Sequence, residues 1–199
     1  MPSFTGAVLD IQNWNTRDLL IVAALGIVAG LALLPVVYAG FAIRAAFGPV
    51  VTALYSGLFY APGLLSLYII RKPGAAILNG VFVALVWIPL TPFGIAVTVP
   101  TLVARVGSEL AFLATGYRRY DRATLLAGGA AGGLLSLAVI YLPFSYQRLP
   151  LAVQFGLLVG NGMSGAVLGG LVPKMLADNL ADTGVLSAYP IVRADGETQ

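Results

Sequence analysis

The sequence lacks two residue types that carry much of enzyme chemistry, because it contains no cysteine and no histidine. The absence of cysteine excludes disulfides and thiol catalysis, and the absence of histidine excludes Ser-His dyads and histidine-based zinc or haem sites. The phosphate-binding pattern G-x-x-x-x-G-K-S/T is also absent, which excludes nucleotide hydrolysis by a P-loop. An intramembrane enzyme would depend on Ser108 or Glu109, with no second carboxylate nearby in the sequence. We therefore expect no enzyme, no cofactor and no metal site.

Charged residues are also scarce. They make up 10% of the 199 residues, whereas hydrophobic residues make up 59% and the mean hydropathy is +0.92. A chain of this length has too little polar surface for a water-soluble globule, but its composition suits a protein surrounded by lipid. The basic residues behind the net charge of +3 lie mostly in short loops rather than on one face, so no nucleic-acid partner is expected. The composition predicts an all-α, polytopic membrane protein.

Six apolar stretches are long enough to cross a hydrocarbon core of roughly 30 Å as helices, at about 1.5 Å per residue. They are residues 19–38, 50–70, 74–93, 95–115, 123–142 and 151–171. We predict an N-terminal segment 1–18, a six-helix membrane domain 19–171 and a C-terminal tail 172–199. Pro89, Pro92 and Pro100 cluster around the end of the third stretch. Because proline removes backbone donors, a broken or re-entrant turn is expected there.

The basic residues in the loops predict the orientation. Eight of them fall on one side of the six stretches: Arg17, Arg71, Lys72, Arg118, Arg119, Arg122, Lys174 and Arg193. Only Arg44 and Arg148 fall on the other side. Basic loops stay in the cytoplasm, so both termini are predicted to be cytoplasmic and the first, third and fifth loops to face outward.

An ionisable pair, Arg105 and Glu109, lies inside the fourth stretch. The two residues are one helical turn apart and would share a helix face. Charges at this depth are costly and usually line a substrate path, a water-filled cavity or a contact between helices. Two interpretations stay open: a structural ion pair, or contact of one of the two residues with a ligand.

Four further side chains are candidates for a binding site. Tyr55 belongs to an aromatic stripe with Phe59, and Trp87 could stack on an aromatic ligand or hold a cation over its ring. Asn79 and Asn161 are amides in mostly apolar stretches, where they could bond another helix or a ligand. The predicted substrate-binding set is Tyr55, Asn79, Trp87, Arg105, Glu109 and Asn161.

Glycines recur four residues apart in three stretches: Gly26/Gly30, Gly128/Gly132, Gly129/Gly133, Gly156/Gly160 and Gly165/Gly169. In lipid, such pairs let helix backbones approach closely. Packing inside the bundle is one interpretation, and docking of another membrane subunit is the other. For Gly26 and Gly30 we predict docking of a partner.

Three segments carry a resemblance to a known family. They are YIIRKPGAA at 68–76, GSELAFLAT at 107–115 and DNLADTGVL at 178–186. Together they resemble the YkoE-type S components, which are the substrate-binding membrane subunits of energy-coupling-factor (ECF) vitamin transporters. The likeness runs from about Trp14 to Leu186.

The resemblance implies a six-helix protein of the prokaryotic plasma membrane that captures a vitamin near its outer side. The implied partners are a transmembrane coupling (T) subunit and two cytoplasmic ATPase subunits, and the implied ligand is thiamine or its precursor hydroxymethylpyrimidine. The chain departs from the family pattern at four positions. Acidic residues are common in the family where this chain has Gly80 and Trp87, a basic residue is common at Asn161, and the residue at Arg105 is usually small. These changes make a poorer host for the thiazolium cation of thiamine.

The function hypothesis is therefore an S component of an ATP-driven importer. The alternative is a solitary carrier or channel for a small polar solute, for which a homodimer through the glycine faces is expected. An intramembrane enzyme is the weakest class. Neighbouring genes for a coupling protein and two ATPases would distinguish the first hypothesis from the other two.

Overall fold

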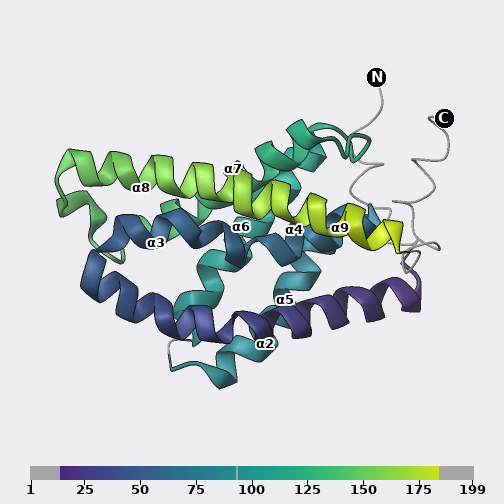
Figure 1. Cartoon of the computed structure of the whole chain (residues 1–199), viewed down its shortest axis with the longest axis horizontal. Coiled ribbons are helices and arrows are strands. Elements are labelled where there is room, and N and C mark those ends of the chain that lie inside the picture. Colours follow the sequence, from purple (N-terminus) through teal and green to yellow (C-terminus); the bar gives the residue numbers. More distant parts are fainter. Residues whose placement is uncertain (1–13, 93, 184–199) are drawn as a thin grey trace.

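The computed structural model describes residues 14–92 and 94–183, and this part of the chain is almost entirely helical (Figure 1). The α-helices are α2 Thr16–Phe47, α3 Pro49–Tyr55, α4 Ala61–Ile70, α5 Ala75–Leu90, α6 Gly94–Ala114, α7 Arg122–Tyr141, α8 Leu151–Ser164 and α9 Val172–Asp182. Short segments complete them: the 3-10 turns η2 Ser56–Phe59 and η3 Tyr146–Arg148, and the π-helix η4 Gly165–Leu171.

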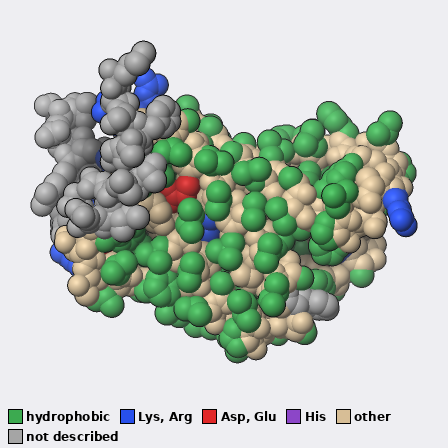
Figure 2. Space-filling view, turned by 180° about the vertical axis from the view of Figure 1, so that it is seen from behind, with side chains coloured by type: hydrophobic (Ala, Val, Ile, Leu, Met, Phe, Trp, Pro, Cys, Tyr) green, Lys and Arg blue, Asp and Glu red, His purple; other side chains and the backbone are tan. Residues whose placement is uncertain are grey.

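These elements form six apolar rods, five long and one short. The segments α3, η2 and α4 form one apolar rod over Pro49–Ile70, and α8, η4 and α9 form another over Leu151–Asp182. Together with α2, α6 and α7, five rods are long and apolar enough to cross a membrane, and α5 is a shorter apolar helix of 16 residues. Hydrophobic side chains cover most of the middle of one face, while Lys and Arg lie mainly toward its two ends (Figure 2). The prediction of an all-α six-helix bundle is confirmed, and the orientation stays a prediction.

Three boundaries differ from the sequence prediction. Helix α2 continues through Pro35 to Phe47 instead of ending at residue 38, because Pro35 interrupts one hydrogen bond without stopping the helix. The last rod continues to Asp182, so the first part of the predicted tail is helical. The turn between α5 and α6 is short, with Pro89 in the last turn of α5 and Pro100 inside α6, and residues 91–92 show no re-entrant segment. Phe93, Arg193, residues 1–13 and residues 184–199 lie outside the described part.

Glycines let α7 pack directly on its neighbours. A Cβ atom on Gly129 would lie 2.0 Å from the carbonyl oxygen of Gly165, and one on Gly132 would lie 2.7 Å from that of Ala104. Only residues without a side chain allow backbones this close. The internal-packing interpretation is therefore confirmed for α7, η4 and α6, and we call the α7–η4 contact the glycine seam.

The docking prediction for Gly26 and Gly30 is wrong. Both glycines are buried against α5 of the same chain. A Cβ atom on Gly26 would lie 2.7 Å from Cβ of Phe82, and one on Gly30 would lie 3.1 Å from Cβ of Val86. The two glycines hold α2 against α5, so their faces are not available to another subunit.

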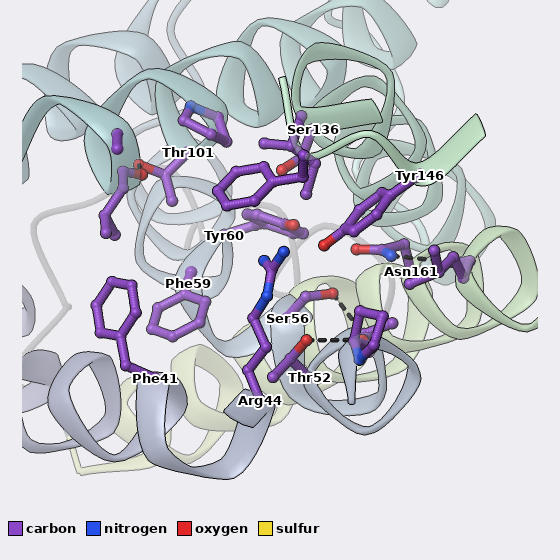
Figure 3. A pocket seen from close by; sticks show the side chains of 18 residues that line it. Phe41, Arg44, Thr52, Ser56, Phe59, Tyr60, Thr101, Ser136, Tyr146 and Asn161 are labelled. Atoms are coloured by element: carbon purple, nitrogen blue, oxygen red, sulfur yellow. Dashed lines mark hydrogen bonds between the residues drawn. The ribbon is translucent and has the colours of Figure 1, made fainter. Parts of the chain in front are cut away.

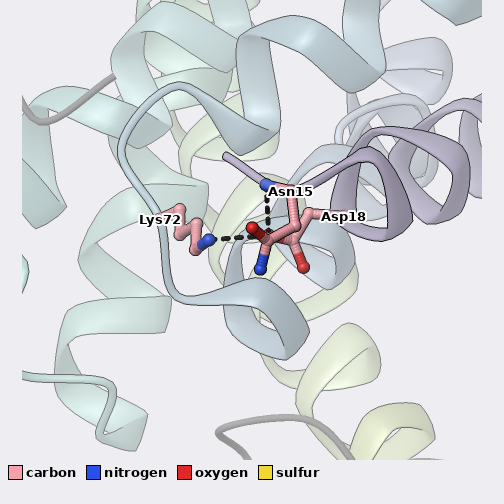
Figure 4. A network of polar contacts seen from close by, with 3 residues as sticks. All are labelled: Asn15, Asp18 and Lys72. Carbon is pink, nitrogen blue, oxygen red and sulfur yellow. Dashed lines mark hydrogen bonds and ion pairs between the residues drawn. The ribbon is translucent and has the colours of Figure 1, made fainter. Parts of the chain in front are cut away.

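The two ends of the bundle are built differently. We call the end where α2 begins and α9 finishes the closed end, and the end where α2 turns into α3 and α7 into α8 the open end (Figure 1). At the closed end Lys72 Nζ lies 2.6 Å from the Asp18 carboxylate, which also accepts the Asn15 N–H at 3.2 Å (Figure 4). The Tyr68 hydroxyl donates to Asp178 at 3.0 Å, so α9 is held to α4.

Candidate binding site

A cavity of about 160 Å³ lies inside the open end (Figure 3). Its polar lining comes from five of the six rods and the α7–α8 loop, and comprises Arg44, Thr52, Ser56, Tyr60, Thr101, Ser136, Tyr146 and Asn161. Aromatic and aliphatic side chains complete the wall, among them Phe41, Phe59, Ile140, Phe144 and Leu157. Concave sites with apolar walls and a few convergent polar groups are typical of small-molecule binding.

The extension of α2 is what brings Arg44 to the cavity. Gly48 ends the helix at φ 80°, a left-handed conformation that glycine adopts without steric cost, and its N–H donates to the carbonyl of Arg44 at 2.9 Å. Pro49 then starts α3 at the first helical position, where a missing N–H does no harm. The chain therefore reverses within one residue, so the last turn of α2 stands beside the first turn of α3.

Arg44 reaches across the opening to the α7–α8 loop. Its guanidinium carbon lies 4.1 Å from the ring centre of Phe144 and 5.3 Å from that of Tyr146. Burial raises the pKa of Tyr146, and the nearby Arg44 lowers it in part, so the phenol keeps its proton at neutral pH. The cation–π contacts hold the guanidinium at the cavity (Figure 3).

The wall has spare hydrogen-bond acceptors. The hydroxyls of Thr52, Ser56 and Thr101 donate to backbone carbonyls of their own helices at 2.7, 2.9 and 2.8 Å. Each hydroxyl oxygen keeps lone pairs for a donor in the cavity. The amide of Asn161 donates to the Leu157 carbonyl at 2.9 Å, which leaves its side-chain oxygen as a further acceptor. These groups suit a ligand that carries amino or hydroxyl donors.

A second hollow of about 130 Å³ adjoins the cavity and shares Phe41, Arg44, Thr52, Phe59 and Val97 with it. It adds Tyr55 to the lining. The Tyr55 hydroxyl is buried and has no hydrogen-bond partner within residues 14–92 and 94–183. A buried polar atom without a partner is unusual, and a ligand donor or acceptor in this hollow would satisfy it.

The structure brings only two of the predicted site residues to these hollows, Asn161 and Tyr55. Trp87 is fully buried behind the wall: its indole N–H donates to the Gly30 carbonyl at 2.9 Å, and its ring meets Phe59 edge to face at 5.8 Å. Asn79 is buried between helices, where its amide donates to Ser66 at 3.0 Å. Trp87 therefore supports the wall through Phe59, whereas Asn79 joins α5 to α4 outside the lining.

Arg105 and Glu109 do not pair with each other. Neither takes part in the ion pairs between described residues, and their hydrogen bonds run in opposite directions along α6. Arg105 donates to the Thr101 carbonyl at 3.1 Å and approaches the Asn79 side-chain oxygen at 3.5 Å. Glu109 accepts the Ala76 N–H at 2.9 Å and the Tyr117 hydroxyl at 2.6 Å, and neither residue lines the cavity. The structural ion-pair interpretation is therefore wrong.

Most of the polar lining escaped the sequence analysis. Arg44 was used there only as one of the two basic residues on the sparsely charged side. An arginine on the side that the positive-inside rule keeps poor in basic residues was itself a signal of a specific role. Tyr60 and Ser136 carried no pattern that separates them from ordinary helix residues, and Tyr146 stood out only as an aromatic residue near the outer interface. No group of three or more acidic, histidine or cysteine side chains that could hold a metal ion occurs among the described residues.

Comparisons with known proteins identify the family to which this fold and sequence are similar. Residues 17–135 match the family described as ABC-type cobalt transport system, permease component. The chain is 30% identical over 182 residues to the putative HMP/thiamine permease protein YkoE of Bacillus subtilis (strain 168), covering 91% of this chain and 92% of that protein. A solved structure titled as an S-component of an ECF transporter superposes with a TM-score of 0.88 at 29% identity, covering 93% of this chain and 94% of the other.

The similarities to YkoE and to the solved S component each cover more than nine tenths of the chain. They therefore apply to the whole protein and not to one segment of it. They mark it as a transport protein rather than an enzyme, and one that works with a small-molecule ligand and other transporter components. The long apolar rods agree with a multi-pass location in the plasma membrane of bacteria. The chain therefore belongs to the YkoE-type family of S components of ECF transporters.

Proposed function

We propose that this S component binds thiamine or hydroxymethylpyrimidine in the open-end cavity and passes it to a coupling subunit driven by two cytoplasmic ATPases. The observation that carries the proposal is the cavity itself, with aromatic walls, acceptor oxygens and a volume of about 160 Å³. A cavity of roughly 150 Å³ in another protein accepts benzene, so this space suits one six-membered ring. The amino and hydroxyl groups of a hydroxymethylpyrimidine match the spare acceptors of the wall.

The orientation follows from the basic residues. Those of the described part that were predicted to be cytoplasmic, from Arg17 to Lys174, lie at the closed end or in the loops beside it, and Arg44 and Arg148 lie at the open end. In this orientation the cavity faces outward, where a substrate is captured. Single cysteines test the orientation in this cysteine-free chain. Gln147→Cys should react with an impermeant thiol reagent in intact cells, and Ala123→Cys should not; the reverse pattern would overturn the orientation.

Ligand binding is measured on the purified chain by tryptophan fluorescence. The sequence has two tryptophans, and in a Trp14→Phe background Trp87 alone reports, through its contact with the cavity residue Phe59. Micromolar binding of hydroxymethylpyrimidine or thiamine is expected. Asn161→Ala should weaken binding at least tenfold because it removes a wall acceptor, whereas the exposed α9 variant Asn179→Ala should not.

Transport distinguishes the proposed function from a solitary carrier. Uptake by cells that express this chain should require the coupling subunit and both ATPases, and it should stop when the ATPases carry inactive P-loops. The glycine faces invoked for a homodimeric carrier lie largely inside the bundle, which removes the main support for that alternative. Uptake by this chain without partners would nevertheless favour the solitary carrier and contradict the coupling proposal.

A further inference from the structure

The charges around the cavity have one sign. Arg44 lines both hollows, and none of the described residues that line either hollow is Asp or Glu. The side chain of Arg44 points into the cavity (Figure 3), where its guanidinium lies against the rings of Phe144 and Tyr146. A charge in such a partly enclosed site is weakly screened, because little water or salt separates it from a bound molecule.

A second arginine lies one layer beneath the wall. Arg105 is fully buried and bonds the carbonyl of Thr101, a cavity residue. Its Nε has no hydrogen-bond partner, and no carboxylate among residues 14–92 and 94–183 forms an ion pair with it.

The surrounding helices leave room for this arginine. A Cβ atom on Gly80 would lie 2.5 Å from Cδ of Arg105, and one on Gly63 would lie 3.0 Å from its Cγ. Both glycines therefore make space for the aliphatic part of the side chain. Burying an unpaired cation costs free energy, so a bundle that makes space for one points to a use for its charge.

We infer that Arg44 and Arg105 make the cavity selective by charge: it takes a neutral single-ring heterocycle such as hydroxymethylpyrimidine and rejects the cationic thiazolium of thiamine. This inference rests on the proposed function and narrows it to one of its two ligands. The adjoining hollow of about 130 Å³ offers further room beside the cavity of about 160 Å³, so the inference rests on charge and not on volume. Size and charge make separate predictions.

Three probes separate size from charge in the purified full-length chain. Hydroxymethylpyrimidine is small and neutral, thiamine is larger and cationic, and the thiophene analogue of thiamine has the size of thiamine without its charge. Titration by Trp87 fluorescence and by calorimetry should rank hydroxymethylpyrimidine first. The thiophene analogue should bind at least tenfold more tightly than thiamine, because the two differ only in charge.

Variants of the arginines test their role through a ratio of affinities, which does not depend on the fraction of folded protein. Arg44→Gln and Arg105→Met should each reduce the preference for the thiophene analogue over thiamine by at least threefold. Arg148→Gln, which removes an exposed arginine at the same end that lines neither hollow, should leave the ratio unchanged. If Arg105→Met does not fold, Arg44→Gln alone decides, since Arg44 is on the cavity wall.

The outcomes are distinct. Equal affinity for thiamine and its thiophene analogue, or tighter binding of thiamine, would overturn the charge selectivity and leave the proposed function intact. An unchanged ratio in Arg44→Gln would also overturn it. Failure of all three probes to bind, with another vitamin binding well, would contradict the proposed ligands and this inference together.

Discussion

The open and closed ends of the bundle use polar residues in opposite ways. At the open end, hydroxyl and amide groups face a hollow and retain free acceptors, and a single arginine bridges to aromatic rings. At the closed end, several polar groups bind one another, as Lys72 binds Asp18 and Tyr68 binds Asp178. The Arg71 Nε and the Tyr120 hydroxyl are buried there without a hydrogen-bond partner among the described residues. Arg71, in a left-handed conformation at φ 54°, lies between the rings of Tyr68 and Tyr120 at 5.6 and 5.1 Å.

Glu109 joins α6, α5 and the loop after α6 at the closed end. Its carboxylate accepts a backbone N–H from the first turn of α5, where the helix dipole favours negative charge. It also accepts the Tyr117 hydroxyl from the loop after α6. Burial and the neighbouring carboxylate both raise the pKa of Tyr117, so this hydroxyl remains a donor at neutral pH. The difference between the ends supports the proposal that a ligand enters at the open end.

The glycine seam joins the two ends and should give the largest effect on stability. Gly129→Ala would bring a Cβ atom to 2.0 Å from the carbonyl oxygen of Gly165, where backbone on both sides cannot yield. Overpacking of this kind costs typically about 1–3 kcal/mol and occasionally more. The apparent unfolding temperature in detergent should fall by several degrees. Gly162→Ala is the matched control, because its nearest contact is a flexible Leu134 methyl at 3.6 Å. Equal stability of the two variants would show that the seam is not tightly packed.

The next largest effect should come from the carboxylate at the closed end. Glu109→Gln keeps the shape, but the Ala76 N–H and the Tyr117 hydroxyl bond different carboxylate oxygens, and glutamine has only one oxygen to accept them. One bond loses its charge and the other donor faces an NH2 group, and a hydrogen bond to a charged group contributes about 1.5–3 kcal/mol. We expect lower stability in thermal unfolding and unchanged ligand affinity, since Glu109 lines neither hollow. Tyr117→Phe should destabilise less, because it removes one of the two donors. A stable Glu109→Gln protein that no longer binds ligand would place Glu109 in the binding site and break the contrast between the ends.

The ion pair between Lys72 and Asp18 should contribute less than Glu109. The two side chains are 25% and 12% exposed, and pairs near the surface usually contribute between about 0 and 1 kcal/mol. Lys72→Met should therefore lower the unfolding temperature only slightly, and less so at high salt, which screens the pair. Asp18→Ala should cost more, because Asp18 also accepts the Asn15 N–H at the start of α2. If Lys72→Met lowered the unfolding temperature strongly and equally at high salt, Lys72 would stabilise the protein mainly by contacts other than its ion pair with Asp18.

The sequence predicted the fold far better than the site. Long apolar stretches bounded by basic loops are strong signals, so the six apolar rods were found. Their ends shifted because α2 continues beyond residue 38 to Phe47 and the last rod continues through the π-helix to Asp182. The cavity depends instead on which side chains meet across five segments and a loop. Residues such as Ser56, Thr101 and Ser136 are ordinary in a membrane helix, and only the tertiary fold brings them together. Gly80 is an example: the tertiary structure shows that a side chain at this position would collide with Arg105, and nothing in the sequence links the two residues.

The smallest expected effect is the coupling between Arg105 and Glu109, and it tests whether the two ends are independent. If these residues formed an ion pair, Arg105→Met and Glu109→Gln would each leave an orphaned charge, and the double variant would recover stability. In the structure they share no hydrogen-bond partner, because Arg105 bonds Thr101 toward the open end and Glu109 bonds Ala76 and Tyr117 toward the closed end. Residues one turn apart on a helix can couple, but these two form no ion pair and share no partner, so we expect a coupling below about 0.5 kcal/mol and a double variant close to the sum of the two single effects. Thermal unfolding of all four proteins in the cycle measures this directly. If the double variant were more stable than this sum by more than about 0.5 kcal/mol, the two charges would interact. The polar groups of the two ends would then not be independent.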